Sequence, residues 1–217
     1  MEKTPKESYV SIIGTGYLQP IVDLFGPLMG NAIPSPSSVT SNYNNGYSAA
    51  SILLSVAMVE SFIRRACLVL HDGKYERALT YAKAHFGDYS RISALEEIFV
   101  LRDVLAHNHM WHADSYWDEE GHLIVDNRQH KAGGDRKFRG VRDESGERTK
   151  ILRLRLFPTA IRHEEAFAVF HEAVDFLLYL EAKGNNIASF SHVPVKHGAD
   201  VDFFRDFLKT VPDPRPG

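Results

Sequence analysis

The chain has 217 residues, of which 44% are hydrophobic and 24% are charged, with 15 glycines and 10 prolines. A chain of this length buries about 70% of the surface that it exposes when unfolded, so its core holds together without cross-links. The composition excludes a disordered tail, a collagen-like rod and a disulfide scaffold. The formal net charge of −3 gives no overall basic field, so a polyanion would have to bind a local patch.

Three features bear on the compartment in which the protein works. The single Cys67 cannot form an internal disulfide, which fits a reducing compartment. Residues 1–20 lack the apolar run and small-residue cleavage site of a signal peptide. The longest apolar stretch, residues 49–59, ends at Glu60, short of the roughly 20 residues that span a membrane. We therefore expect a cytoplasmic protein.

Residues 1–47 are predicted to form an N-terminal extension and loop, and residues 48–217 to form the main domain. The extension is sparsely charged, and residues 33–46 are rich in proline, serine, asparagine and glycine, which are typical of turns. Residues 17–29 have the apolar pattern of a short helix within this extension.

Hydrophobic periodicity predicts the helices of the main domain. The strongest pattern begins after Ser48, a residue type favoured at N-caps. Ser93 and Glu96 have the spacing of a capping box at the start of another helix. Pro158 suits the first turn of a long helix that Gly184 ends. The predicted helices span residues 48–71, 74–86, 92–106, 158–184 and 201–209.

A β insertion over about residues 113–157 is predicted between these helices. Residues 151–156 alternate with period two, as a half-buried strand does, and residues 122–125 offer an apolar partner for an antiparallel ribbon. The predicted fold class is therefore mainly α. It is a helical bundle with a small antiparallel β-hairpin insertion before the long C-terminal helix.

Arg102 has an unusual place in the predicted helix 92–106. At 100° per residue it falls on the apolar stripe of that helix. Leaving a desolvated guanidinium unpaired costs several kcal/mol, so it must meet a carboxylate, a phosphate or an interface. In a purely structural interpretation its partner is Glu60 or Asp103. Glu60 also precedes Arg64 by one helical turn, a spacing typical of a surface salt bridge.

His107 follows Asp103 by four residues, which makes their side chains neighbours on a helix surface. A carboxylate beside an imidazole fixes its tautomer. Such a histidine suits accepting a proton from a ribose 2′-OH, or donating one to a leaving 5′-oxygen. Arg102 would add a fixed positive charge for the transition state. A histidine at a helix end is also a common C-terminal cap, so the spacing by itself leaves both interpretations open.

The segment Arg102–His107, with the sequence RDVLAH, resembles the Arg-x4-6-His motif of the HEPN superfamily. The resemblance covers roughly residues 48–183, where the helices around the motif match that family's layout. It implies a compact bundle, frequent homodimers and, in many members, a metal-independent endoribonuclease that leaves a 2′,3′-cyclic phosphate. Such members serve as toxins, abortive-infection proteins or other antiviral defence effectors. The family often has asparagine at the position that Asp103 fills here.

The resemblance implies that Arg102 stabilises the transition state, that His107 is the acid or base, and that Asp103 orients it. Glu60 and Asn108 are candidate auxiliary residues. No cofactor is predicted. The expected partners are RNA, a second copy of the chain, and a cognate antitoxin or defence-system protein.

We also expect a symmetric homodimer with a composite site. On an ideal helix, Arg102 and His107 point about 140° apart, so one copy does not readily aim both at one phosphate. Two helices paired around a two-fold axis would turn each Arg102 toward a shared cleft that either His107 could reach.

Two other classes of function remain open. A non-catalytic HEPN-like module would use Arg102 and His107 only to build an interface or to bind a nucleotide. A metal-dependent hydrolase would use His107, His109 and His112, although residues two apart on a helix point to different faces. Cleavage of RNA by the pure protein separates the nuclease from the module. Resistance to a chelator separates it from the metal enzyme.

Residues 126–155 carry ten Lys or Arg against five Asp or Glu, an excess of five positive charges in an acidic chain. This segment is either a solvated hairpin or an arm that contacts phosphates. In the second case Trp111, Tyr116 and Trp117 are available to stack on bases. The predicted RNA-binding residues are Arg136, Lys137, Arg139 and Trp111.

Overall fold

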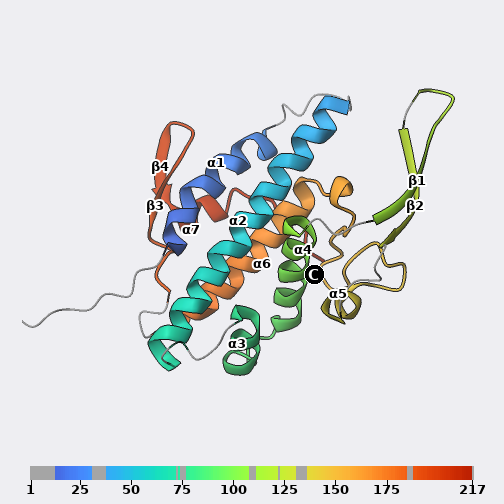
Figure 1. The fold of residues 1–217 in the computed structure, drawn as a ribbon. Helices are drawn as coiled ribbons and strands as arrows, with labels where there is room; N and C mark the ends of the chain where they lie inside the picture. The colour runs from blue at the N-terminus through green and yellow to red at the C-terminus, as the bar shows by residue number, and fades with distance from the viewer. Residues whose placement is uncertain are drawn as a thin grey trace, which may run out of the picture.

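The computed structural model describes residues 13–30, 38–71, 73, 77–107, 111–121, 123–130, 136–184 and 188–216. Within these ranges the chain is mainly helical. The helices are α1 (Leu18–Met29), α2 (Ser38–His71), α3 (Ala78–His85), α4 (Ile92–Ala106), α5 (Arg136–Val141), α6 (His163–Ala182) and α7 (Phe204–Leu208). The strands are β1 (Trp111–Trp117), β2 (Leu123–His130), β3 (Pro194–His197) and β4 (Asp200–Phe203). Figure 1 shows one helical bundle with the β1–β2 hairpin at its side.

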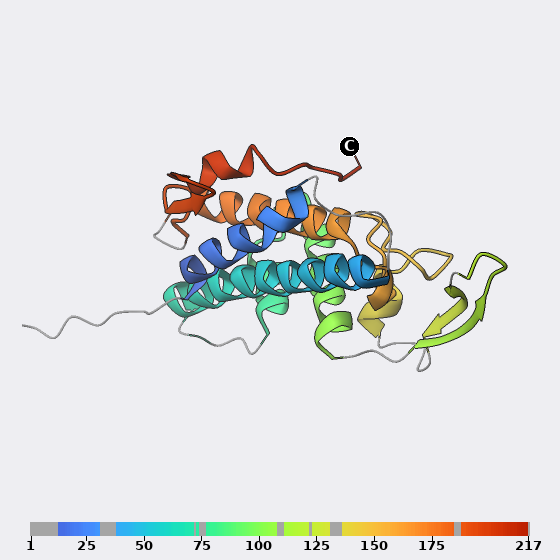
Figure 2. The same cartoon turned by 90° about the horizontal axis from the view of Figure 1, so that it is seen from above.

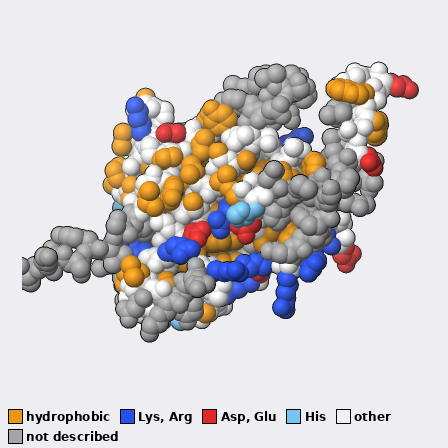
Figure 3. Space-filling view, viewed as in Figure 1, with side chains coloured by type: hydrophobic (Ala, Val, Ile, Leu, Met, Phe, Trp, Pro, Cys, Tyr) orange, Lys and Arg blue, Asp and Glu red, His pale blue; other side chains and the backbone are white. Residues whose placement is uncertain are grey.

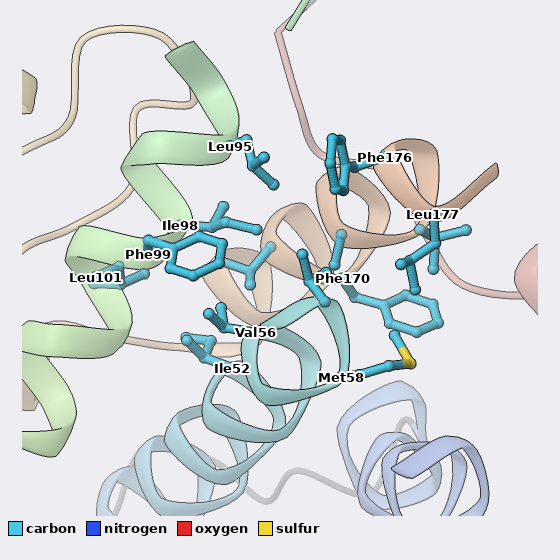
Figure 4. Packing of buried hydrophobic residues seen from close by; sticks show 14 of the residues in the cluster. Ile52, Val56, Met58, Leu95, Ile98, Phe99, Leu101, Phe170, Phe176 and Leu177 are labelled. Carbon is cyan, nitrogen blue, oxygen red and sulfur yellow. The ribbon is translucent and has the colours of Figure 1, made fainter. Parts of the chain in front are cut away.

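The centre of the bundle is the pair α2 and α6, which run side by side in the same direction (Figure 1). Apolar side chains recur at helical spacing on both, so each buries a stripe against the other. α4 packs against both helices, and α1 packs against α2. Figure 4 shows Ile52 and Val56 of α2 meeting Ile98 of α4 and Phe170 of α6. Figure 2 shows α1, α2 and α6 extending along the long direction of the molecule.

The helix predicted to start at Ser48 begins earlier, at Ser38, the first residue of α2. Ser48 is therefore not a cap: it is buried inside the helix, and its hydroxyl donates to the backbone oxygen of Asn44 at 2.7 Å. The side chain of Asn45 donates to the backbone oxygens of Pro158 and Ile161, at 2.7 and 2.9 Å. These bonds tie the early turns of α2 to the segment that leads into α6. A tertiary contact thus overrides the turn preference of asparagine.

The short helix predicted at residues 17–29 is confirmed as α1, which follows a 3-10 helix at Gly14–Tyr17. Phe25 is fully buried and belongs to the same core as α2 and α6. A Cβ atom on Gly14 would lie 2.6 Å from the ring of Phe62, so glycine is required where the 3-10 helix approaches α2. Part of the predicted extension is therefore packed into the main core.

The long helix predicted to start at Pro158 begins later, as α6 at His163, because Pro158–Ala160 form a separate 3-10 helix. The predicted helix at 92–106 is confirmed as α4, but its expected cap is wrong. α4 has no side-chain cap, and Ser93 lies inside the helix. A cap is found at α6 instead, where the Glu165 carboxylate accepts a hydrogen bond from the backbone N–H of Arg162 at 2.9 Å. α3 begins after its predicted start, and residues 74–76 of that prediction lie outside the described residues.

The predicted pairing of residues 122–125 with residues 151–156 is wrong. β2 pairs instead with β1 in an antiparallel hairpin, with Trp117 opposite Leu123. Residues 151–156 form none of the strands: the Glu97 carboxylate accepts the backbone N–H groups of Ile151 and Leu152, and residues 154–156 bond instead to residues 147–149. The alternation itself is correct, since every second residue of this segment is buried: Leu152, Leu154 and Leu156. A hairpin does precede the long helix, but other residues build it.

The C-terminal segment contains a hairpin that the sequence patterns did not predict. β3 and β4 pair antiparallel, so the helix predicted at 201–209 is reduced to α7. The Gln19 side chain of α1 bonds the backbone of Lys196 in both directions, at 2.9 and 2.7 Å, which holds β3 against α1. Among the described helices, none is long and apolar enough to cross a membrane.

Candidate functional site

A pocket of about 390 Å³ opens where α2, α4 and α5 meet the residues that begin α3. Its apolar lining includes Leu79, Phe99 and Phe138, which are all buried. Its charged lining comes from all four elements. Three of the residues singled out by the sequence motif, Arg102, Asp103 and His107, line this one pocket.

Arg102 pairs with both of the carboxylates that the structural interpretation named. Its Nη2 lies 3.3 Å from Oε2 of Glu60, and its Nε lies 3.0 Å from Oδ1 of Asp103. The Nε–H is not directed at that oxygen, and this buried atom has no hydrogen-bond partner within the described residues. The guanidinium also lies 5.6 Å from the ring centroid of Phe99. Arg102 is thus held from three sides, with one N–H donor unused.

Glu60 divides its two oxygens between two arginines. Oε1 accepts from Nε and Nη2 of Arg64, at 3.2 and 3.1 Å, while Oε2 faces Arg102. The predicted surface pair of Glu60 and Arg64 is therefore confirmed. The same carboxylate also positions Arg102, so the two interpretations of Glu60 hold together.

Arg102 lies on the apolar stripe of α4, as predicted, but the end of that stripe leaves the core. Leu95 and Phe99 are buried, whereas Ala106 is exposed, and the Arg102 side chain is 26% exposed. Only this face of the last turn is exposed, because Val104 in the same turn is fully buried. The charge therefore lies at a pocket wall rather than in the core, which lowers its desolvation cost.

His107 is the C-cap residue of α4, with φ −101° and ψ 12°. Its backbone N–H donates to the carbonyl oxygen of Asp103 at 3.0 Å, which closes the last turn. The imidazole Nε2 lies 3.9 Å from the Asp103 carboxylate, and the side chain is 70% exposed. The imidazole is therefore accessible to a ligand, and Asp103 influences it through charge rather than through a direct hydrogen bond.

Neither of the two reasons for a composite site requires a second copy of the chain. One copy brings Arg102 and His107 to the same pocket, because His107 has left helical geometry and the arginine side chain is long. The charge of Arg102 is met by Glu60 and Asp103 of its own chain. The homodimer stays a prediction, and the pocket geometry does not depend on it.

The pocket lining has an excess of positive charge. Four cationic side chains, from Arg64, Arg77, Arg102 and Lys137, face the two carboxylates of Glu60 and Asp103. The excess is two positive charges before any charge on His107 is counted. Figure 3, which views the molecule from the same side as Figure 1, shows basic, acidic and histidine side chains clustered near the middle of the visible face. A cavity with this lining favours an anion such as a phosphate.

The predicted RNA-binding residues are only partly brought together. Lys137 lines the pocket from α5, while Arg136 and Arg139 lie exposed on the same helix. Trp111 begins β1, but its side chain lies outside the described part of the chain. Arg77, at the N-cap of α3, was not predicted to contribute. No local pattern marks Arg77, because only the packing of α3 beside α4 places it at the pocket.

Several residues named from the sequence cannot be placed. Asn108, His109 and the side chain of His112 lie outside the described residues, so the three-imidazole site has no geometry to discuss. Among the side chains that the structure does describe, no group of three His, Cys, Asp or Glu could hold a metal ion.

Comparison of the chain with protein-family models, with curated proteins and with solved structures gives no match.

Proposed function

We propose that this chain is a metal-independent endoribonuclease of HEPN type, which works in a toxin–antitoxin or antiviral defence system. The observation that carries the proposal is the convergence of Arg102, Asp103 and His107 on one pocket with a cationic lining. The motif residues thus share a cavity with the positive charge that an RNA phosphate needs. The HEPN-like fold and the role in defence rest on the sequence motif.

In the proposed reaction the ribose 2′-oxygen attacks the adjacent phosphorus. A new O2′–P bond forms, the P–O5′ bond breaks, and the product carries a 2′,3′-cyclic phosphate. His107 either takes the proton from the 2′-OH or gives one to the leaving 5′-oxygen, since its imidazole is exposed and an imidazole can accept or donate a proton. The other proton is exchanged with water.

Arg102 supplies the fixed charge in this proposal. Glu60 and Phe99 hold its guanidinium in place at the wall of the pocket. Lys137 and Arg77 add positive charge from other elements of the same pocket. A fixed cation stabilises the charge that develops on the phosphoryl oxygens more than it stabilises the substrate.

One observation favours a second candidate, a non-catalytic module that binds a nucleotide or a partner protein. Arg102 lies within ion-pair distance of two carboxylates, so much of its charge is already balanced. If those pairs persist when a ligand binds, the pocket can hold a phosphate without driving its chemistry. Binding without cleavage is the outcome that this candidate predicts.

The decisive experiment incubates the purified protein with single-stranded RNA in excess EDTA and analyses the product ends. We expect cleavage with cyclic-phosphate ends, and a loss of about 10²–10⁴-fold in rate for His107→Ala, the range for general acid–base catalysis. His192→Ala is the matched control, because His192 is an exposed histidine that does not line the pocket. Cleavage that needs a divalent ion, or that persists in His107→Ala, would contradict the proposed mechanism.

The contribution of α5 is measured by the salt dependence of RNA binding. Suppose that Arg136, Lys137 and Arg139 each neutralise one phosphate of the RNA. Replacing all three with glutamate should then make the slope of the logarithm of the RNA-binding constant against the logarithm of the salt concentration shallower, by about two units for single-stranded RNA. Arg205→Glu is the control for a change of charge elsewhere on the surface, since Arg205 belongs to α7. An unchanged slope in the triple variant would assign these three bases to the solvated surface.

A further inference from the structure

A second cavity, of about 260 Å³, lies between residues 148–155, the start of α6 and the C-terminal segment. It shares no lining residue with the pocket that contains Arg102, and the proposed reaction does not use it. Its apolar lining includes Leu152 and Leu154, which are both buried. Its basic lining comes from three arginines of one short segment: Arg148, Arg153 and Arg155.

The arginine turn, residues 147–156, folds back on itself. Residues 147–149 bond to residues 154–156, and this pairing sets Arg148 directly opposite Arg155. Like charges directly opposite each other destabilise an antiparallel pair. Arg153 brings a third positive charge to the same cavity. The turn therefore gathers like charges at a place where backbone pairing favours opposite ones.

The backbone of Arg153 also has an unfavourable conformation. Its φ of 58° is the only positive value for a non-glycine residue in the described part of the chain. A Cβ atom disfavours this left-handed region, and residues held there cluster at ligand sites. The backbone N–H of Leu152 donates to Glu97 at 2.8 Å, which fixes the residue before Arg153. The N–H of Leu154 donates to Oγ1 of Thr149 at 3.0 Å, which fixes the residue after it. The turn thus holds an arginine where glycine would cost less.

Each of the three arginines bonds within the described chain through Nη1 alone. Nη1 of Arg155 lies 2.8 Å from Oε2 of Glu165, and Nη1 of Arg153 lies 2.9 Å from Oδ2 of Asp143. Nη1 of Arg148 donates to the backbone oxygen of Arg153 at 2.7 Å. The unbonded Nε and Nη2 of Arg148 and Arg155 are not buried, and Arg153 is exposed. Nε and Nη2 present parallel N–H donors on one edge of a guanidinium, which can bind an oxyanion bidentately.

The cavity keeps an excess of one positive charge after its own carboxylates are counted. Glu164 and Glu165 lie 3.6 and 2.8 Å from the same nitrogen, Nη1 of Arg155. Glu165 is buried, so its pair with Arg155 fixes that guanidinium in place. Arg148 has no carboxylate within ion-pair distance among the described side chains. These ion pairs position the arginines and leave one charge of the lining unbalanced.

The C-terminal segment closes one side of the cavity. It runs back along α6 toward the start of that helix (Figure 2). Pro214 and Pro216 line the cavity, and Arg215 between them lies 2.6 Å from Oδ2 of Asp175 in α6. The cavity therefore has a basic side and an apolar side, an arrangement typical of sites for small molecules.

We propose that this cavity binds a small ligand through a terminal phosphate group. Such a group has three strong acceptor oxygens and a charge of about −1.5 to −2 near pH 7, which suits several guanidinium edges at once. A carboxylate has two oxygens and a single charge. The volume of about 260 Å³ is below the roughly 300–1,000 Å³ of sites for drug-sized ligands, so the rest of the ligand is small. The site does not depend on the nuclease activity proposed for the other pocket.

The test follows the backbone amide NMR signals of the full-length protein during titration with inorganic phosphate at constant ionic strength. A parallel titration with glycerol 3-phosphate represents a small phosphate monoester, and the tighter binder identifies the source of the phosphate. The amides of residues 148–155 should shift and saturate, while those of residues 99–106 report separately on the pocket at α4. Arg148→Gln should weaken binding about tenfold or more, as expected for a lost charge-assisted hydrogen bond. Arg136→Gln is the matched control, because Arg136 is exposed on α5 and does not line the cavity.

Arg153→Gly separates the side chain from the backbone conformation. Glycine adopts a positive φ without strain, so the midpoint of thermal unfolding should not fall, while the affinity for phosphate should. The absence of a saturable shift at residues 148–155, or an affinity unchanged in both Arg148→Gln and Arg153→Gly, would overturn the proposal. Saturation by single-stranded RNA but by neither phosphate would overturn it in favour of an RNA contact. Phosphate binding here in a protein that does not cleave RNA would contradict only the nuclease.

Discussion

Two regions of this molecule set arginine against carboxylate, and they differ in burial. At the Glu172 cluster in α6, the carboxylate is fully buried and accepts from Nε of Arg91 at 2.8 Å and from the Tyr89 hydroxyl at 3.1 Å, with Nη1 of Arg215 at 3.5 Å. At the pocket, Glu60 and Arg102 are 24% and 26% exposed and border a cavity of about 390 Å³. The residue types are the same, and the surroundings are not.

The difference teaches what each pair can do. Burial raises the pKa of the Tyr89 hydroxyl and of the Glu172 carboxyl, because desolvation penalises their charged forms. With its carboxylate fully buried and both oxygens already bonded, the Glu172 cluster serves to hold elements together. It joins α6 to the turn before α4 and to the C-terminal segment. Glu60 and Arg102 at the pocket are partly solvated, so replacing one of their contacts with a contact to a ligand costs little free energy.

The largest expected effect separates the two regions by stability. Glu172→Ala leaves Arg91 and Arg215 beside a cavity without their shared carboxylate, and should lower the free energy of unfolding by about 3–5 kcal/mol. Glu60→Ala, the matched control, should lower it by about 1 kcal/mol or less, because its ion pairs are partly solvated. Urea unfolding of both variants measures the difference. Equal losses would mean that burial does not distinguish the two regions.

A smaller loss of stability is expected at Glu97, a second buried carboxylate with different partners. Glu97 is 1% exposed and accepts the backbone N–H groups of Ile151 and Leu152, both at 2.8 Å. Glu97→Ala leaves those two donors without acceptors and should cost about 1–3 kcal/mol. Glu97→Gln keeps one acceptor oxygen and should cost less. If the two variants lose the same amount, the backbone bonds are not the source of the stability.

The two arginines provide the sharpest contrast, because their roles should dissociate. Arg102→Lys should change the free energy of unfolding by less than about 1 kcal/mol, as for other partly exposed ion pairs, while abolishing RNA cleavage. Arg91→Lys should show the reverse, with stability reduced and cleavage retained. Thermal unfolding and the EDTA cleavage assay, run on both variants, measure this. A variant that loses both properties would merge the two regions into one functional unit.

The smallest effect concerns acid pH. The Lys183 ammonium and then the Tyr179 hydroxyl donate to Asp88, which holds the pKa of that carboxyl below its ordinary value of 3.8. A carboxyl whose pKa is lowered by folding adds stability above pH 3.8 that is lost as the pH falls through the lowered value. Asp88→Asn should therefore flatten the fall in stability below pH 3.8. An acid transition identical to that of the wild type would show that this exposed pair contributes nothing measurable.

The order of the main helices could be predicted from the sequence alone. Apolar residues repeat at helical spacing in α2, α4 and α6, and this periodicity fixes which face of each helix is buried. The same reasoning placed Arg102 on the apolar stripe of α4 and His107 near the helix end. It also gave the alternating burial of Leu152, Leu154 and Leu156. Each of these features depends only on residues close together in the chain.

Only the tertiary structure decided what those faces meet. β2 pairs with β1 rather than with residues 151–156. That segment bonds elsewhere, through two backbone N–H groups to Glu97 of α4 and through residues 154–156 to residues 147–149. Arg77 and Lys137 enter the pocket because α3 and α5 pack beside α4. A local sequence pattern can predict that a side chain is buried or charged, but it does not identify a partner that is distant in the sequence. The pocket is made by partners that are distant in sequence, so its lining is a property of the packed fold.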